Sequence, residues 1–253
     1  MTKVGLKKTL LAVTLSATLA GCAAVPPTAG ENPNDPWEAF NRQTNEFNMT
    51  LDDYVLRPVT ECYVDWVPEP VRDSVSNFFD NLTEPRNTIN NILQGKIGDG
   101  FVSLVRFVIN TTVGVVGLFD VADKMDLKAA PEDFGQTLAV WGVPSGPYIV
   151  WPFLGPSTIR ESVGSGADIF SQPTYWAYSN SEDWKYGVPL TALSVVDMRS
   201  RLLAADAMLK SAIDPYVAMR EAYLNNRINQ IYDGNPPLVL QVDEFEDEFE
   251  DEQ

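Results

Sequence analysis

The segment from Phe101 to Phe119 constrains the fold most, because it is nineteen residues long and apolar on nearly every side. That length is close to the roughly 20 apolar residues that a helix needs to span a bilayer. Within it, Arg106, Asn110, Gly114 and Gly117 follow one another at steps of four, four and three. On a helix this spacing places them in one stripe. The segment therefore predicts an apolar helix with a single polar-to-small face.

Two interpretations of this helix are open. In the first, it is a buried helix of a soluble domain, and Arg106 pairs with a carboxylate. In the second, it lies in a membrane with its apolar sides toward lipid and with Arg106 and Asn110 toward a polar passage. A lipid-facing arginine at mid-membrane costs at least about 2.5–3.5 kcal/mol, so such residues usually face protein or a water-filled cavity. Gly114 and Gly117 would allow a neighbouring element to approach closely.

Residues 1–21 have the organisation of a signal peptide, with three lysines before a short apolar run. The run ends in Leu19-Ala20-Gly21-Cys22, which resembles the bacterial lipoprotein signal. That resemblance implies that Cys22 carries acyl chains such as palmitate and becomes the first mature residue. It also implies sorting to the outer membrane, because Ala23 rather than aspartate follows the cysteine. The alternative is an ordinary secretory peptide cleaved near Ala20.

Three further regions follow the signal peptide. Residues 22–34 are rich in proline, glycine and threonine and are expected to form a flexible tether. Residues 35–232 are expected to form one helical domain. Residues 233–253 form an acidic tail with eight acids in its last eleven positions, and like charges at that density favour disorder. Cys62 is the only thiol besides Cys22, and we expect it to be a small buried side chain.

Composition excludes several kinds of chemistry. The chain has no histidine, so it lacks the residue required by histidine-based nucleophilic catalysis and by histidine-ligated metal sites. Its net charge is −17, and −20 once the signal peptide is removed, which argues against nucleic-acid binding. No phosphate-binding loop, zinc motif or nucleophile elbow is present. We therefore predict no catalytic residue, metal or cofactor, and no enzymatic activity.

Carboxylates remain the one basis for an alternative prediction of catalysis. Glu132 with Asp133, or Glu161 with Asp168, could in principle serve a glycosidase-type hydrolysis. Sequence spacing does not test this possibility, and most such acid pairs are solvated surface charges.

The remaining pattern is mostly helical. Asp35-Pro36-Trp37-Glu38 predicts a helix start with Asp35 as the N-cap and proline at the first helical position. No run alternates with a period of two, so no strand is predicted. The segment 131–156 is rich in proline, glycine and aromatic residues and predicts irregular backbone. The predicted helices cover residues 35–51 and 70–82, a stretch from after Pro85 to Gly95, residues 101–119, and a last stretch that follows Asp214-Pro215 and runs to Ile231.

Five blocks of the sequence, in order, resemble the MlaA (VacJ) family of outer-membrane lipoproteins. The first is Asp35-Pro36-Trp37-Glu38-Ala39-Phe40-Asn41-Arg42. The others are Pro85-Arg86-Asn87 through Gly95, Arg106 through Thr111 with Gly114 to Ala122, Phe134 through Leu138 with Gly142 to Pro152, and Asp214-Pro215-Tyr216 through Tyr223. Together they cover most of residues 35–227 and follow a lipoprotein signal, which makes the resemblance specific.

The resemblance implies an all-α, ring-shaped, membrane-embedded domain with irregular Pro/Gly-rich loops, lying in the inner leaflet of the outer membrane. In this family, a channel passes phospholipid misplaced in the outer leaflet toward the periplasm and so maintains lipid asymmetry. The implied partners are the phospholipid itself, a trimeric porin of the OmpC/OmpF type and the periplasmic lipid carrier MlaC. The alternative function is that of a structural or tethering lipoprotein that transports nothing.

The stripe and the loop then acquire expected roles. We expect Arg106, Asn110, Gly114 and Gly117 to line the channel, with the two polar side chains close to a phosphate headgroup. The Pro/Gly-rich loop is expected to lie at the channel mouth, and its candidate residues are Gly142, Gly146, Pro147, Tyr148 and Gly155.

Overall fold

The computed structural model describes residues 25–26, 28–172 and 184–237. The predicted signal peptide and Cys22 lie outside these residues, as do most of the acidic tail and part of the tether. The described elements are α2 (Glu38–Leu51), a π-helical turn (Asp52–Leu56), α3 (Arg57–Trp66), α4 (Glu69–Leu93), α5 (Ile97–Thr112), α6 (Val121–Lys124), α7 (Phe134–Val140), β1 (Tyr148–Trp151), β2 (Gly155–Thr158), α8 (Ile159–Asp168), a 3-10 turn (Ile169–Ser171), α10 (Trp184–Leu202), a 3-10 turn (Leu203–Ala205), α11 (Asp206–Ser211) and α12 (Pro215–Ile231).

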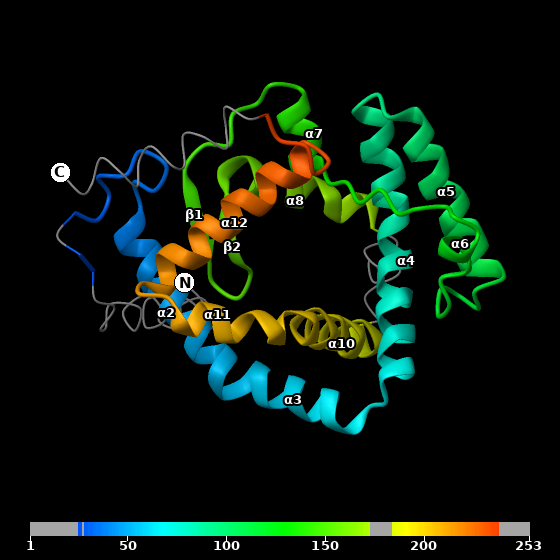
Figure 1. Cartoon of the computed structure of the whole chain (residues 1–253), viewed down its shortest axis with the longest axis horizontal. Helices are drawn as coiled ribbons and strands as arrows, with labels where there is room; N and C mark the ends of the chain where they lie inside the picture. The colour runs from blue at the N-terminus through cyan, green and yellow to red at the C-terminus, as the bar shows by residue number, and fades with distance from the viewer. Residues whose placement is uncertain (1–24, 27, 173–183, 238–253) are drawn as a thin grey trace, which may run out of the picture.

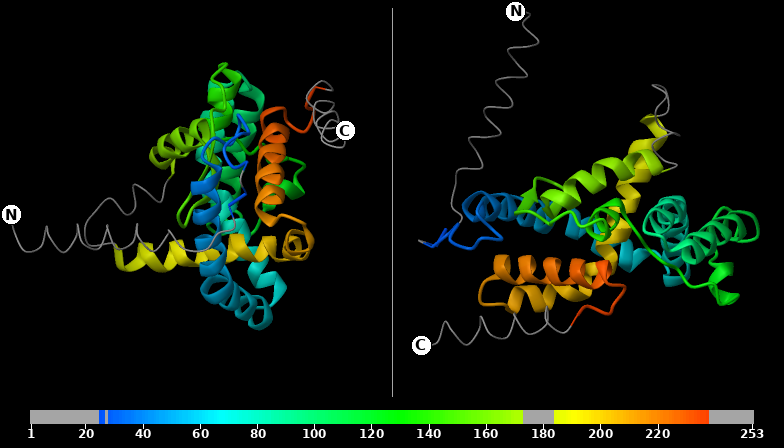
Figure 2. Two further views of the ribbon diagram at one scale, coloured as in Figure 1. Left: turned by 90° about the vertical axis from the view of Figure 1, so that its left-hand side faces the viewer. Right: turned by 90° about the horizontal axis from the view of Figure 1, so that it is seen from above.

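The helices are arranged as a ring (Figure 1). In this view α4 forms one side and α3 and α10 run along the bottom. The opposite side contains α2, the β1–β2 hairpin and α12, and α7 with α8 completes the top. Helix α5 packs on the outer side of α4, and Figure 2 shows α12 and α8 on opposite faces of the ring. The predicted helical, ring-shaped fold is confirmed.

The N-terminal motif ties α2 to distant parts of the ring. Helix α2 starts after Trp37, and no side chain caps it, so the prediction of Asp35 as N-cap was wrong. Asp35 is instead fully buried and accepts hydrogen bonds from Asn41 Nδ2 at 2.8 Å and Arg220 Nη1 at 2.9 Å. Asn41 also bonds the backbone of β1, because Val150 N donates to its Oδ1 at 2.9 Å. The motif therefore joins α2, β1 and α12.

The hairpin contradicts the prediction that the chain contains no strand. Strands β1 and β2 pair antiparallel, with Tyr148 opposite Thr158 and Trp151 opposite Gly155. The first three residues of β1 are all buried, so β1 lacks the alternation of polar and apolar residues that marks a half-exposed strand.

Helix α4 is one helix of 25 residues, although two were predicted on either side of Pro85. A proline inside a helix removes one hydrogen bond and crowds the carbonyl four residues earlier. Here the lost bond is offset by tertiary contacts, because α4 packs along α5 and its amide side chains bond the segment before α7. Asn91 Nδ2, for example, donates to the carbonyl of Ala130 at 2.9 Å.

Helix α5 begins at Ile97, earlier than the predicted residue 101, and it also ends earlier than the predicted residue 119. It ends at Thr112, and the next residues form turns in which Val115 and Val116 have φ of 54° and 59°. β-branched residues rarely adopt this conformation, so hydropathy alone does not predict such a turn. Gly117 (φ 89°) follows, and a Cβ there would lie 2.7 Å from the side chain of Asn81. No helix among the described residues is both long and apolar enough to cross a membrane.

Polar side chains fill the interior, and many apolar ones lie on the outside. Among the described residues, five hydrophobic side chains are buried, against 24 polar or charged ones. Trp66, Phe101 and Leu154 are 85%, 65% and 84% exposed. Large exposed apolar areas on a protein usually contact a partner or a membrane. Cys62, predicted to be buried, is also exposed, because only one side of α3 packs against α10.

Candidate functional site

Arg106 lies in a buried ionic cluster between α4, α5 and α6. Its side chain is almost wholly buried, and its Nε donates to Glu84 Oε1 at 2.7 Å. Its Nη2 donates to Asp120 Oδ2 at 2.9 Å, and its Nη1 donates to the carbonyl of Leu127. Each guanidinium nitrogen is therefore bound to an acceptor of the same chain.

The other members of the stripe are packed in the same interface. Asn110 Nδ2 donates to Asp120 Oδ1 at 3.0 Å, and Asn110 Oδ1 accepts from Ala122 N at 2.9 Å. A Cβ on Gly114 would collide with backbone, and Gly117 contacts Asn81. These contacts match the first interpretation of the helix, in which Arg106 pairs with a carboxylate and the polar stripe faces protein. We call it the packed interpretation. A role in lining a channel stays a prediction.

The candidate mouth residues divide between the two ends of the hairpin. Gly142 and Gly146 lie in the exposed loop before β1, with φ of 86° and 67°, and Pro147 there is half-buried. Tyr148 is fully buried in the small aromatic core. Gly155 follows the hairpin turn and lines a cleft. A common role at a channel mouth stays a prediction, because the structure does not bring these residues together.

The cleft lies between the hairpin, α8 and α12 and has a volume of about 700 Å³. We call it the hairpin cleft. Its lining combines apolar and polar side chains. The apolar ones include Trp151, Leu154, Pro156, Ile169 and Tyr223, and the polar ones include Asp133, Ser157, Glu161, Ser162, Arg227 and Gln230.

Helix caps and two glycines position its polar side. Asp133 caps α7 by accepting from Gln136 N at 2.9 Å, and Thr158 caps α8 by accepting from Glu161 N at 3.3 Å. The two helices meet at Gly135 and Gly164, and a Cβ on Gly164 would collide with the backbone of Gly135. This close approach brings the first turns of α7 and α8 to the same part of α12.

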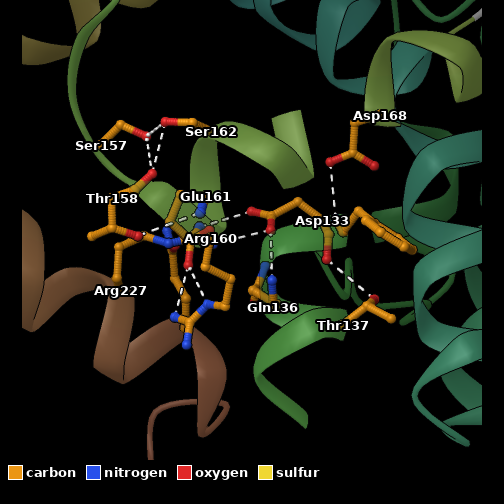
Figure 3. Close-up of polar contacts among 12 residues, drawn as sticks. Asp133, Gln136, Thr137, Ser157, Thr158, Arg160, Glu161, Ser162, Asp168 and Arg227 are labelled. Carbon is orange, nitrogen blue, oxygen red and sulfur yellow. Dashed lines mark hydrogen bonds and ion pairs between the residues drawn. The ribbon is translucent and has the colours of Figure 1, made fainter. Parts of the chain in front are cut away.

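Four charged side chains form a network at the cleft (Figure 3). Arg227 of α12 donates to both oxygens of Asp133, at 2.7 Å and 3.0 Å, and also to Glu161. The other oxygen of Glu161 accepts from Arg160 Nε at 3.0 Å and Nη2 at 2.8 Å. Arg160 Nη1 also donates to the carbonyl of Val143 at 3.2 Å. The network thus connects α7, α8, α12 and the loop before β1.

The protonation states of this site follow from its contacts. Burial opposes ionisation of Asp133, but the hydrogen bonds and charge of Arg227 outweigh it and hold the pKa of Asp133 below its ordinary value. Burial, partly opposed by the charge of Arg227, raises the pKa of Tyr223 to about 12. At neutral pH the cleft therefore contains an ionised Asp133 and an uncharged Tyr223.

Asp168 and Glu132 are the other two carboxylates that were considered for hydrolysis, and both bond to neighbouring segments of the chain. Asp168 accepts from Asn90 Nδ2 at 3.0 Å and from Phe134 N at 2.9 Å. Glu132 accepts from Lys96 Nζ at 2.8 Å. Neither Asp168 nor Glu132 lines the hairpin cleft. In the described part of the chain, no group of three or more acidic or cysteine side chains could hold a metal ion.

Sequence reasoning did not single out Arg160, Arg227 or Trp151. Arg227 contacts Asp133 and Glu161 from 94 and 66 positions away, which no local pattern reveals. A signal was present on α12, where Tyr216, Arg220, Tyr223 and Arg227 follow at steps of four, three and four. That spacing places them on one face of the helix.

Comparisons with known proteins agree with this fold. The family model described as MlaA lipoprotein matches residues 33–230. The intermembrane phospholipid transport system lipoprotein MlaA of Escherichia coli (strain K12) is 39% identical over 223 residues, which are 86% of each chain. Its counterpart in Haemophilus influenzae is 35% identical over 235 residues, covering 90% of this chain and 92% of the relative.

A solved structure is similar as well. It comes from work on the structural basis for maintenance of bacterial outer membrane lipid asymmetry, and it matches with a TM-score of 0.68 and 36% sequence identity. The match covers 79% of this chain and 99% of the other. The predicted resemblance is thus confirmed over most of the chain, and the protein belongs to the MlaA lipoprotein family.

Proposed function

We propose that this protein acts at the outer membrane, where it removes mislocalised phospholipid from the outer leaflet and so maintains lipid asymmetry. The relatives are named for intermembrane phospholipid transport, and the similar structure concerns outer-membrane lipid asymmetry. The transported molecule is a phospholipid, and its movement requires no bond to be made or broken.

The observation that carries this proposal is the distribution of side chains over the ring. Many large apolar side chains are exposed, whereas the buried side chains are mostly polar and are held by hydrogen bonds and ion pairs. In water, exposure of so many large apolar side chains would be costly, but in contact with acyl chains it is favourable. The protein is thus suited to lie in one leaflet, although the helices that the structure describes are too short or too polar to cross the bilayer.

The hairpin cleft supplies a path for the lipid headgroup. A phospholipid leaving a bilayer must keep its charged headgroup solvated or bound while its acyl chains stay in apolar surroundings. The cleft offers both environments, because Trp151 and Leu154 line it together with Asp133 and Arg227. We assign the cleft to the passage that the lipid takes through the ring.

The anchor and the partners are part of the same proposal. Acylated Cys22 would fix the ring at the periplasmic side of the outer membrane, since several acyl chains on one cysteine form a stable anchor. A trimeric porin of the OmpC/OmpF type would hold the ring in place, and a periplasmic carrier of the MlaC type would receive the lipid. The lipoprotein signal and the family resemblance support these assignments.

The substitution Gly166→Trp tests the passage. Gly166 lies on α8 in the cleft lining, and a Cβ there meets no atom within 4 Å, so the indole ring enters the cleft without disturbing the helix. We expect transfer of labelled phospholipid from outer-membrane vesicles to purified carrier to fall several-fold. Gly98→Trp is the matched control, because Gly98 lies on α5 and its Cβ is equally free of contacts.

The transfer assay also separates transport from tethering. Wild-type protein and the Gly98→Trp variant should transfer lipid at similar rates, in the direction of the carrier. If the wild type gives no directional transfer, the protein is a tether. If both tryptophan variants transfer lipid as fast as the wild type, the hairpin cleft is not the passage.

The anchor is tested by labelling cells with radioactive palmitate. We expect Cys22→Ser to abolish labelling and to remove the protein from the outer-membrane fraction, because the acylated thiol is lost. Cys62→Ser is the matched control and should be labelled like the wild type, since Cys62 follows no lipoprotein signal. Labelling that persists without Cys22 would show that the chain is not anchored there.

A further inference from the structure

The hairpin cleft brings both signs of charge next to aromatic rings. Asp133, Glu161 and Arg227 line it, and so do Trp151 and Tyr223. Its volume of about 700 Å³ lies within the range of pockets that hold small ligands, roughly 300–1,000 Å³. A ligand that carries two opposite charges and an apolar part would complement this lining.

The charge balance of the network disfavours a ligand with a net charge. Glu161 bonds Arg160 as well as Arg227, so two carboxylates face two guanidinium groups. The four groups together are neutral. A net anion in the cleft would remain uncompensated in partly desolvated surroundings, which is costly, whereas a zwitterion brings no net charge.

Three residues of the cleft lining attract cations. The side chain of Asp133 is 23% exposed, and a carboxylate can only accept hydrogen bonds, so its open lone pairs suit an N–H donor. Trp151, which belongs to the same lining, is 38% exposed. The faces of indole and phenol rings attract ammonium groups through cation–π interactions. Asp133, Trp151 and Tyr223 thus give the lining three groups that favour a primary ammonium group.

The same part of the cleft also offers donors to a phosphate, because Arg227 is bonded directly to Asp133. Arg227 Nε is buried and has no hydrogen-bond acceptor in the protein, which is unusual for a buried donor. The hydroxyls of Ser157 and Ser162 lie 3.0 Å apart in the same lining, but both donate to the carbonyl of Thr158, so Ser165 supplies the remaining hydroxyl. A guanidinium N–H and a hydroxyl are donors from which phosphate oxygens accept readily.

We propose that the hairpin cleft is a headgroup site that selects phospholipids bearing a primary ammonium group beside the phosphate. Ethanolamine-type headgroups have this chemistry and are zwitterionic, whereas glycerol-type headgroups leave the phosphate charge unbalanced. This inference rests on the proposed function and adds a substrate class to it. Lipids with a net negative charge enter the cleft less readily, because both arginines of the network are already paired with carboxylates.

Capture from mixed vesicles tests the inference. The acylated full-length protein in detergent is incubated with vesicles of equal amounts of dioleoyl phosphatidylethanolamine and dioleoyl phosphatidylglycerol, and the captured lipids are quantified by mass spectrometry. We expect the ethanolamine lipid to exceed the glycerol lipid about fivefold, the order given by one cation–π contact with one charge contact. Equal capture of the two lipids would overturn the inference and leave the proposed function intact. Capture of neither lipid would overturn both.

The substitution Asp133→Asn tests whether the hairpin cleft, rather than another part of the ring, determines the headgroup preference. Asparagine is also a good N-cap, so α7 keeps its start while the negative charge is removed. We expect the preference to fall toward one with little change in total lipid. Asp126→Asn is the matched control, because Asp126 is exposed away from the cleft and its φ of 63° suits asparagine. A preference that survives in Asp133→Asn would show that another part of the ring reads the headgroup.

A soluble competitor distinguishes a lipid site from a small-molecule site. Glycerophosphoethanolamine carries the same phosphate and ammonium without acyl chains. At equimolar concentration we expect it to leave capture of the ethanolamine lipid unchanged, because it lacks the apolar contacts. Displacement of the lipid at that concentration would identify a small-molecule site and overturn the assignment.

Discussion

Replacing Arg106 by glutamine is expected to lower the free energy of unfolding by about 3–5 kcal/mol, the range for breaking a buried ion pair from one side. The substitution removes the partner of Glu84, whose side chain is as buried as that of Arg106. It also removes one of the bonds to Asp120. Denaturant unfolding in mild detergent, followed by circular dichroism, measures the loss.

Arg57→Gln is the matched control for this prediction. Arg57 also contacts several carboxylates, but it lies at the surface, where such pairs add little. Its unfolding midpoint should therefore remain close to that of the wild type. If the Arg106 variant instead unfolds like the wild type yet fails to transfer lipid, Arg106 acts on the lipid, and the packed interpretation is wrong.

The same variant should change the acid side of the stability curve. Burial raises the pKa of Asp120, but the backbone bond from Asp123 and the bonds from Arg106 and Asn110 outweigh it, so the net shift is downward. Because the pKa of Asp120 is lower in the folded state, its ionised form stabilises the fold at pH values above the unfolded pKa of about 4. This stabilisation is lost as the pH falls through the folded pKa. Without Arg106 the pKa of Asp120 is lowered less, so the loss of folding stability at acid pH should be smaller.

Replacing Asp35 by alanine is expected to cost a similar amount, about 3–5 kcal/mol, because it removes a fully buried carboxylate with three donors. Arg220 would lose its partner at 2.9 Å, and the hydroxyl of Tyr216 would lose its acceptor at 2.5 Å. Asn41 Nδ2 would lose its hydrogen bond to Asp35, so the orientation in which it also bonds the backbone of β1 would be less well fixed. The ring should therefore loosen where α2, β1 and α12 meet.

A double-mutant cycle shows whether Asp35 and Arg220 act as a pair. Asp35→Ala and Arg220→Met should each be destabilising, and the double variant should lose clearly less than the sum of the two. Asp65→Ala is the matched control, since Asp65 is exposed on α3, and it should leave the unfolding midpoint unchanged. Strict additivity in the cycle would show that the two residues stabilise the ring independently.

The sequence predicted the elements whose signals are local. Asp214 and Pro215 mark the start of α12, and in the structure Asp214 accepts from Tyr216 N at 3.0 Å. The helix predicted over residues 35–51 likewise corresponds to α2. The ring itself was predicted only through the family resemblance, because helix periodicity says nothing about how helices are arranged.

The elements that were missed depend on contacts between distant residues. Strand β1 is buried on both sides, so it shows no alternation. Pro85 is a helix breaker by local rules, yet α4 continues through it because its side chains are bonded to other segments. Arg106 and Asn110 lie on α5, but Gly114 and Gly117 follow its end. Glu84 and Asp120 approach Arg106 from separate parts of the chain, which no local pattern reveals. The hairpin cleft likewise forms only after α7, α8 and α12 have come together.

The polar interior has a thermodynamic consequence. The heat capacity of unfolding rises with the apolar surface newly exposed to water and falls with newly hydrated polar surface. This ring buries five hydrophobic side chains against 24 polar or charged ones among the described residues. Its heat capacity change should therefore be smaller than the roughly 12–15 cal/mol/K per residue of water-soluble domains. A small value flattens the stability curve, so the ring should keep nearly the same stability across a wide range of temperature.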